Sequence, residues 1–148
     1  MIEQMKALAK EKDICVLATV SGGIPHCSLM AYVTDDDCRE IFMATHKQTV
    51  KYANLKENPS VSLLIDTREE HSGSHRRETK ALTVSGVFQT IGDTEKKKCV
   101  RATLLERHPH LKTFLANPDA EIFGIKIKSF LLLDGLTNAH FEGLDQAK

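Results

Sequence analysis

The chain has 148 residues, a length typical of one domain, with 41% hydrophobic and 27% charged residues. That balance is typical of a folded globular protein and excludes a disordered or fibrous chain. Twenty Lys and Arg residues balance twenty Asp and Glu residues. The chain therefore lacks the excess positive charge of a general nucleic-acid or membrane-surface binder.

The first third of the chain predicts one helix and three strands. Apolar residues recur at helical spacing over residues 2–12, which indicates a short amphipathic helix. β-Branched and apolar residues predict strands over residues 14–20 and 26–33, and the turn residues 21–23 between them favour a hairpin. A third strand is expected over residues 41–45.

A polar segment over residues 46–58 is compatible with a helix that ends before Pro59. Thr45 and Gln48 have the spacing of a capping box, with Thr45 as the N-cap. The next apolar run, residues 60–66, predicts a fourth strand.

The following stretch, residues 67–79, has no apolar periodicity and is expected to be an exposed, mobile loop. A long strand is expected over residues 81–91, with a bulge or bend at Gly86. Helices are expected over residues 93–107 and 110–116.

Residues 121–134 alternate between apolar and polar in the manner of a strand with one face toward water. Strands joined by hairpins, with a few intervening helices, favour a mainly β (α+β) fold over a doubly wound parallel sheet. The expected architecture is an antiparallel barrel with peripheral helices.

Several chemistries have no support in the sequence. It contains no GxSxG, GxxxxGK or GxGxxG motif, and its four cysteines form no CxxC pair. His71 and His75 are four residues apart but lack a third ligand, so no metal site is expected. No apolar run is long enough to span a bilayer and no signal peptide is evident, so a cytoplasmic protein with reduced thiols is expected.

The corner between the third strand and the helix after it has the chemistry of a phosphate site. Thr49 and Lys51 lie in the first turns of that helix, and Thr45 precedes them. Unpaired N–H groups, the helix dipole, a hydroxyl and an ammonium would together suit a phosphate monoester. On these physics alone, capping and solvated roles for the same residues are an equally good interpretation.

The order of elements resembles the pyridoxamine 5'-phosphate oxidase-like split barrels that bind flavin mononucleotide (FMN). The likeness covers residues 2–134: the stretch 14–66, the strand TVSGVFQTI, the ERHP of residues 106–109 and a closing strand. It implies one FMN-binding split-barrel domain over residues 1–148. It also implies a homodimer in which each flavin sits between two barrels.

The resemblance also implies site residues. The family's phosphate pattern, T-x3-[ST]-x-K, here reads Thr45, Thr49, Val50 and Lys51, and many members have arginine where this chain has Val50. The family lays the flavin ring along the second strand, which by alignment is Ser28, Leu29, Met30, Ala31 and Tyr32. An extended backbone offers N–H and C=O groups that match the edge of the ring's pyrimidine portion.

The implied function is that of an FMN-binding flavoprotein, an oxidoreductase acting on an unidentified small-molecule substrate. No catalytic residue is assigned, although His26 and His46 flank the expected cofactor region and are either proton donors or structural histidines. The alternatives are a cofactor-binding or haem-binding protein without turnover, with His26, His46 or His140 as axial ligand, a deazaflavin-dependent reductase, and a cofactor-free structural dimer.

Oxidation of pyridoxamine 5'-phosphate itself is not expected. The true oxidases end in a tryptophan and an Arg/His-rich segment that binds the substrate phosphate. This chain has no tryptophan, and beyond Lys128 only His140 and Lys148 could carry positive charge. A doubly charged phosphate would therefore lack its charge-assisted partners.

Overall fold

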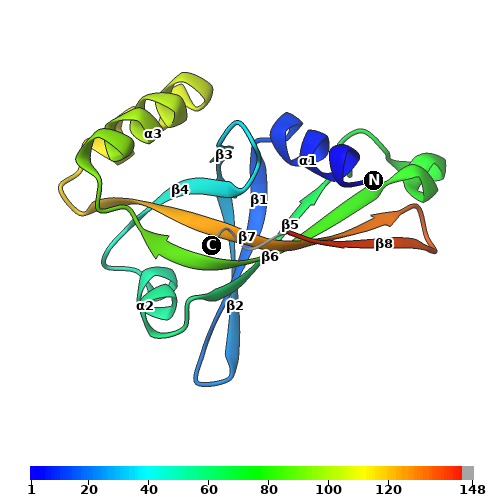
Figure 1. Cartoon of the computed structure of the whole chain (residues 1–148), viewed down its shortest axis with the longest axis horizontal. Coiled ribbons are helices and arrows are strands. Elements are labelled where there is room, and N and C mark those ends of the chain that lie inside the picture. Colours follow the sequence, from blue (N-terminus) through cyan, green and yellow to red (C-terminus); the bar gives the residue numbers. More distant parts are fainter. Residues whose placement is uncertain (145–148) are drawn as a thin grey trace.

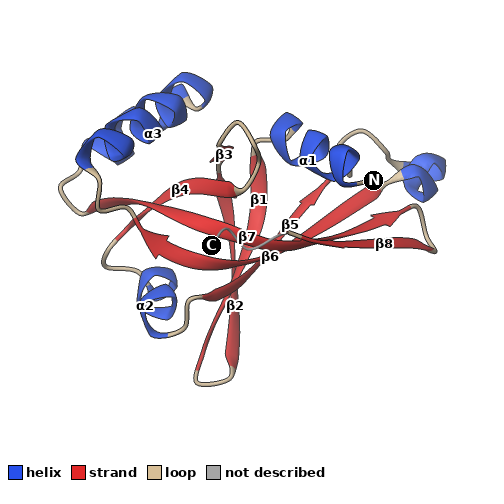
Figure 2. Ribbon diagram, viewed as in Figure 1, coloured by secondary structure: helices blue, strands red, loops and turns tan. Residues whose placement is uncertain are grey.

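An antiparallel sheet of eight strands dominates the computed structural model, which describes residues 1–144 (Figures 1 and 2). The strands are β1 Ile14–Ser21, β2 Ile24–Ala31, β3 Val33–Thr34, β4 Glu40–His46, β5 Ser60–Asp66, β6 Lys80–Thr90, β7 Ala120–Asp134 and β8 Asn138–Gly143. The helices are α1 Ile2–Glu11, α2 Val50–Glu57, α3 Thr94–Arg107 and α4 Lys112–Ala116, with 3-10 turns η1 Gly73–Glu78 and η2 Pro109–Leu111.

The sheet curls until its two ends meet. Its strand order is β2-β1-β5-β6-β7-β4-β3, and β8 pairs with β7 outside this path. The terminal strands β2 and β3 are consecutive in the chain and separated only by Tyr32, so one extended segment pairs first with β1 and then with β4. The expected antiparallel split barrel with peripheral helices is confirmed.

The core fills the inside of the curled sheet because alternate strand residues point inward. Leu17, Leu63, Phe130 and Phe123 are among the largest side chains that are fully buried there. A second apolar cluster lies under α3, where Val100, Leu104 and their neighbours pack against the outer side of β4 and β7. The peripheral helices therefore cover apolar surface that the barrel leaves uncovered.

Bonds from distant residues satisfy the last carbonyl groups of α1. Arg107 donates from its two terminal nitrogens to the oxygens of Lys10 and Glu11, at 2.9 and 2.6 Å. The hydroxyl of Tyr32, which is buried, donates to the oxygen of Ala9 at 2.6 Å. Carbonyls at a helix end have no partner inside the helix. These contacts therefore fasten α1 to α3 and to the end of β2.

The bulge expected at Gly86 is confirmed, because the register between β6 and β7 shifts between Ser85 and Gly86. The capping prediction is wrong. Thr45 lies inside β4, and α2 begins at Val50 with Thr49 as its N-cap. The intervening segment stays outside the helix because Asp119 holds it, accepting N–H bonds from Lys47 and Gln48.

Two further elements were not expected from the sequence. The loop after β5 contains the 3-10 turn η1, whose residues are exposed. Beyond residue 134, β8 forms a hairpin with β7 around Gly135. No helix among residues 1–144 is long and apolar enough to cross a membrane.

Candidate functional site

The barrel is split between β2 and β4, and the predicted site residues lie on both sides of this split. β4 pairs with β7 along its whole length but with β3 only at Ile41 and Phe42. β2 pairs with β1 and, within the described residues, has no strand on its other edge. The two facing strand edges therefore present main-chain N–H and C=O groups that do not pair with a neighbouring strand.

The register shows which main-chain groups of β2 point into the split. The N–H of Tyr32 donates to the oxygen of Asp13 on the β1 side, at 3.0 Å. Hydrogen-bonded pairs recur at every second residue of an antiparallel ladder. Consequently Met30 and Ser28 direct their main-chain groups toward β1, while Ala31 and Leu29 direct theirs toward the split.

The corner between β4 and α2 forms the other side of the site. The Thr49 hydroxyl accepts from the N–H of Tyr52 at 3.1 Å and donates to the oxygen of His46 at 2.9 Å. The first N–H groups of a helix have no intrahelical acceptor. Those of Val50 and Lys51 find none elsewhere in the described chain, so they remain available to a ligand.

Lys51 connects the two sides. Its Nζ lies 3.1 Å from the sulfur of Met30, which is its one hydrogen-bonding contact within the described residues. A thioether is a weak acceptor, and partial burial lowers the pKa of the Lys51 ammonium. The structure thus holds a partly desolvated cation beside β2 with no anionic partner among residues 1–144, which favours binding of an anion at this point.

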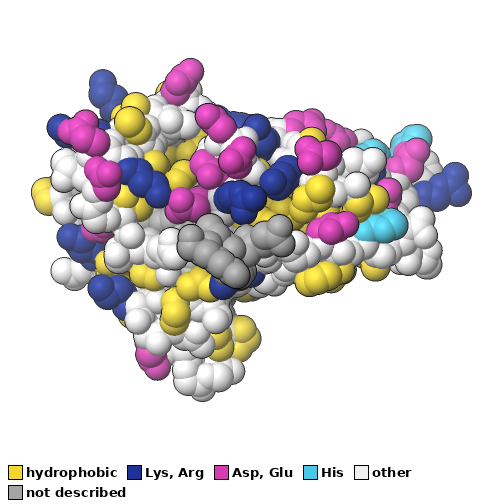
Figure 3. All heavy atoms as spheres, in the orientation of Figure 1, with side chains coloured by type: hydrophobic (Ala, Val, Ile, Leu, Met, Phe, Trp, Pro, Cys, Tyr) yellow, Lys and Arg dark blue, Asp and Glu magenta, His cyan; other side chains and the backbone are white. Residues whose placement is uncertain are grey.

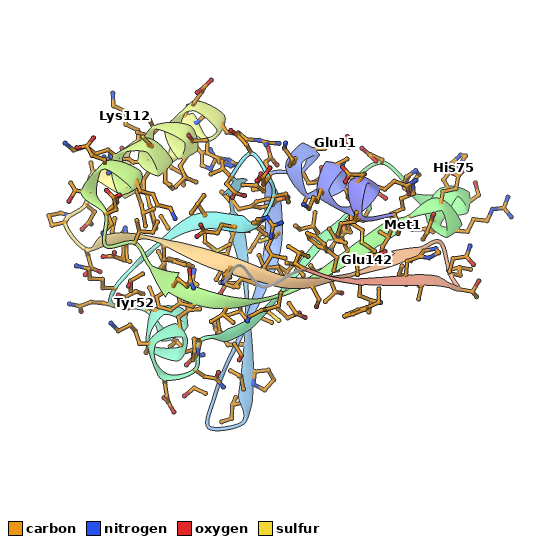
Figure 4. All side chains as sticks on the ribbon, in the orientation of Figure 1. Met1, Glu11, Tyr52, His75, Lys112 and Glu142 are labelled. Atoms are coloured by element: carbon orange, nitrogen blue, oxygen red, sulfur yellow. The ribbon has the colours of Figure 1, made fainter. Side chains whose placement is uncertain are left out.

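The helix that carries Lys51 is fixed against the barrel. Leu55 is fully buried, and the Asn54 amide donates to the hydroxyl of Thr19 on β1 at 3.1 Å. Tyr52 packs edge-on against Phe88 of β6, with ring centroids 6.4 Å apart, and lies where α2 approaches the strands (Figure 4). The position of Lys51 is therefore set by packing of the whole helix.

Two of the predicted site residues lie apart from the others. Thr45 is 1% exposed, and its hydroxyl oxygen lies 3.4 Å from that of Thr49. Tyr32 directs its side chain toward α1, and its main-chain N–H and C=O are already bonded to Asp13 and His108. The rest of the predicted set gathers at the split: Ser28, Leu29, Met30, Ala31, Thr49, Val50 and Lys51.

The histidines considered from the sequence have different surroundings. His46 stacks on Phe114 with centroids 4.0 Å apart, and its Nε2 lies 3.3 Å from the Phe114 oxygen. His26 and His140 are exposed. His108 was missed as a residue of this region; it is buried, and its Nε2 donates to the Tyr32 oxygen at 2.9 Å.

His71 and His75, whose spacing was noted in the sequence, each have a separate hydrogen-bonding partner in the loop. His71 Nδ1 lies 3.0 Å from the Thr67 hydroxyl, and His75 Nδ1 lies 3.0 Å from a carboxylate oxygen of Glu78. Within residues 1–144, no group of three or more histidine, cysteine or acidic side chains is placed to hold a metal ion.

The fold and the split define the chain as a split-barrel protein. The family model described as pyridoxamine 5'-phosphate oxidase matches residues 1–134, and the chain belongs to that family. No curated protein matches the sequence.

Solved structures share the fold at low sequence identity. A haem-binding protein from Mycobacterium smegmatis superposes with a TM-score of 0.83 at 18% identity, over 95% of this chain and 57% of that one. This chain therefore spans little more than half of that protein. A haem storage protein from Vibrio cholerae gives 0.72 at 23% identity, over 90% of this chain and 93% of that one.

An FAD-binding protein from Mesorhizobium loti gives a TM-score of 0.72 at 18% identity, over 89% of this chain and 93% of that one. These structures bear out the architecture. Two of these proteins are named for haem and one for FAD, so the choice of cofactor rests on the residues of this chain.

Proposed function

We propose that this protein binds FMN at the split and acts as an oxidoreductase on a small-molecule substrate. The observation that carries the proposal is Lys51, a partly buried ammonium that touches the sulfur of Met30 and has no anionic partner within the described residues. A phosphate monoester would supply the missing anion, and the free N–H groups of Val50 and Lys51 would add donors.

The edge of β2 suits the other end of the same ligand. Ala31 and Leu29 direct N–H and C=O groups into the split, in the alternation of donors and acceptors that the pyrimidine portion of a flavin ring requires. Met30 lies on the same strand and contacts Lys51. The residue proposed to bind the phosphate, Lys51, therefore lies next to the strand edge proposed to bind the ring, so one elongated ligand could contact both.

The flavin supplies hydride and electron transfer when bound. The chain's part is to hold the phosphate, orient the ring against β2 and limit water on that side of the ring. Among the described residues, His46 and His26 are the two candidate proton donors for this reaction. His46 is engaged with Phe114, whereas His26 is exposed on β2. His26 is therefore the more accessible proton donor.

The test is flavin binding by the Lys51→Met variant, measured by fluorescence titration. Loss of a charge-assisted hydrogen bond to phosphate costs about 1.5–3 kcal/mol, so FMN affinity should fall about 10- to 150-fold. Riboflavin lacks the phosphate, and its affinity should stay unchanged. Lys56→Met, on the same helix and away from Met30, is the matched charge control.

Unchanged FMN affinity, or an equal loss for riboflavin, would show that Lys51 does not bind the phosphate. Thr49→Ala is a less discriminating variant because Thr49 also caps α2, so its loss would combine weaker binding with a weaker helix. Turnover is tested separately, by mixing the reduced holoprotein with candidate electron acceptors and the oxidised holoprotein with candidate electron donors, pyridoxamine 5'-phosphate among the donors. If reoxidation is no faster than that of free reduced flavin and no donor reduces the bound flavin, the protein binds the cofactor without catalysis.

Haem is the second candidate cofactor. His26 is exposed and has no hydrogen-bond partner in the described chain, and on β2 it shares a face with Ser28 and Met30. A free imidazole beside an open edge can serve as an axial iron ligand. The visible spectrum of the purified protein separates the cases, since haem gives an intense Soret band that His26→Ala should alter and flavin gives two weaker bands.

A further inference from the structure

A cavity of about 210 Å³ lies between α3, the end of α4 and the first residues of β7. None of the residues assigned to the FMN site lines it, so it is separate from the split. It is called the α3 cavity below. Within the described chain its lining residues are Thr94, Lys97, Lys98, Arg101, Leu115, Ala120 and Ile122.

The floor of the α3 cavity is apolar. Leu115 and Ile122 are buried and belong to the apolar cluster under α3. Ala120, at the start of β7, contributes only a methyl group and so leaves space above the strand. Apolar cavities of about 150 Å³ hold a benzene ring. The space above this floor therefore suits an apolar body about the size of one aromatic ring.

Arg101 brings a positive charge to the wall of this space. Its Nη1 donates to the main-chain oxygen of Leu115 at 2.8 Å, and the side chain is partly buried. A guanidinium has five N–H donors in a planar fork, and those of Arg101 find no other partner within residues 1–144. The fork matches the two oxygens of a carboxylate. A partly buried cation with unused donors therefore favours binding of a carboxylate here.

The charged side chains around the α3 cavity leave a surplus of positive charge. Lys97 is paired, since its Nζ lies 2.9 Å from a carboxylate oxygen of Glu121. Lys98 lies 3.7 Å from Glu95, but these side chains are 71% and 83% exposed, and such surface pairs contribute little. Figure 3 shows basic, acidic and hydrophobic side chains mixed over α3, yet among the described residues that line the cavity none is acidic. Beyond the paired Lys97, the walls therefore hold two cations, Lys98 and Arg101.

Contacts outside the cavity fix the elements that form its walls. In α4, the ring of Phe114 stacks on His46 of β4 with centroids 4.0 Å apart. The segment that leads into β7 is held by Asp119, whose carboxylate accepts from the N–H of Gln48 at 3.2 Å. The end of α3 is held by Arg107, which donates to the last carbonyl groups of α1. The walls are therefore in place before a ligand arrives, which lowers the entropic cost of binding.

We infer that the α3 cavity binds a small monocarboxylate with an apolar body, of the class of aryl carboxylates. The carboxylate pairs with the guanidinium of Arg101, and the ring rests on Leu115 and Ile122. A single negative charge matches the site, because Glu121 already neutralises Lys97 and a dianion would bring a charge without a partly buried partner. The inference is independent of the proposed function, since it uses none of the residues at the split.

Benzoate is the probe, titrated into ¹⁵N-labelled protein while the amide chemical shifts are followed by NMR. A ligand of this size should bind with a dissociation constant of about 1–10 mM. The amide signals of Leu115 and Ile122 should shift and saturate together. Benzyl alcohol has the ring without the charge, and acetate has the charge without the ring. Each of these matched probes should bind at least about 10-fold more weakly than benzoate.

Substitutions in the wall of the cavity test the role of its charges. Arg101→Met should weaken benzoate binding at least about 10-fold, because a charge-assisted hydrogen bond is lost. Arg101→Met also removes the bond to the Leu115 oxygen, so Lys98→Glu is a second variant at an exposed position. It reverses a charge at the cavity and should weaken binding about 5-fold. Lys96→Met is the matched control, since Lys96 pairs with Glu40 and does not line the cavity.

The inference is overturned if benzoate shifts no signal at the α3 cavity, if benzyl alcohol binds as well as benzoate, or if both Arg101→Met and Lys98→Glu bind like the wild type. Shifts confined to Thr49 and Lys51 would place benzoate at the split and would equally refute it. The Lys51→Met variant separates this site from the proposed flavin site. It should bind benzoate like the wild type, whatever its affinity for FMN, so either proposal can fail without the other.

Discussion

Replacing Gly86 with alanine tests whether the bend in β6 is set by close backbone packing. A Cβ at this position would lie 2.6 Å from Cγ2 of Ile125 and 2.7 Å from the main-chain oxygen of Lys126. Ile125 is fully buried and the oxygen belongs to the backbone of β7, so neither can easily move away. Overpacking of this kind costs about 1–3 kcal/mol. We expect the free energy of unfolding to fall by that amount, and the melting temperature to fall about 4 °C per kcal/mol.

Gly92→Ala is the matched control because a Cβ there would meet nothing within 4 Å. Its free energy of unfolding should change by no more than about 0.5 kcal/mol. Urea denaturation of both variants and the wild type measures the difference directly. If Gly86→Ala proves as stable as the wild type, or if Gly92→Ala loses as much, the bulge does not depend on the absence of a side chain at Gly86.

Two further substitutions examine polar contacts, one buried and one at the surface. Tyr32→Phe removes the hydroxyl that donates to the Ala9 oxygen at 2.6 Å, so the unfolding free energy should fall by about 1–3 kcal/mol in urea denaturation; no loss would mean that water satisfies the carbonyl. Hydrogen bonds from Arg68 lower the pKa of the Asp66 carboxyl in the folded protein. The ionised carboxylate should therefore stabilise the fold fully at pH values above the ordinary pKa of an unfolded aspartate. This contribution should be lost as the pH falls through the lowered pKa of the folded state. The wild type should therefore be more stable than Asp66→Asn at neutral pH and converge with it in acid, and a difference that stays constant with pH would refute the linkage.

Most elements were predictable because their signals are local. The strand over residues 60–66 was predicted with its observed bounds, and the bulge at Gly86 was predicted from a lone glycine in a strand. The fold class followed from the order of these elements. Hydrophobic alternation and turn residues operate over a few neighbouring positions, so a single sequence reveals them.

The errors arose where a distant residue decides the local structure. Thr45 and Thr49 are equally good caps by residue type, and Asp119, from the segment that leads into β7, holds the chain between them outside the helix. β8 was missed because its short, mostly small and polar sequence depends on pairing with β7. Likewise, the contact between Lys51 and Met30 joins two elements whose approach no local pattern encodes.

The break between β2 and β3 determines both how the sheet closes and where the candidate site lies. Three hydrogen bonds hold Tyr32 at this break, to the oxygens of Asp13 and Ala9 and from the ring of His108. At Tyr32 the chain leaves β1 and joins β4, so the preceding residues of β2 keep a free outer edge. The switch at Tyr32 closes the barrel where β3 pairs with β4, and it leaves the edge of β2 unpaired. The edge that an elongated ligand could use is therefore a direct consequence of how the chain passes from β1 to β4.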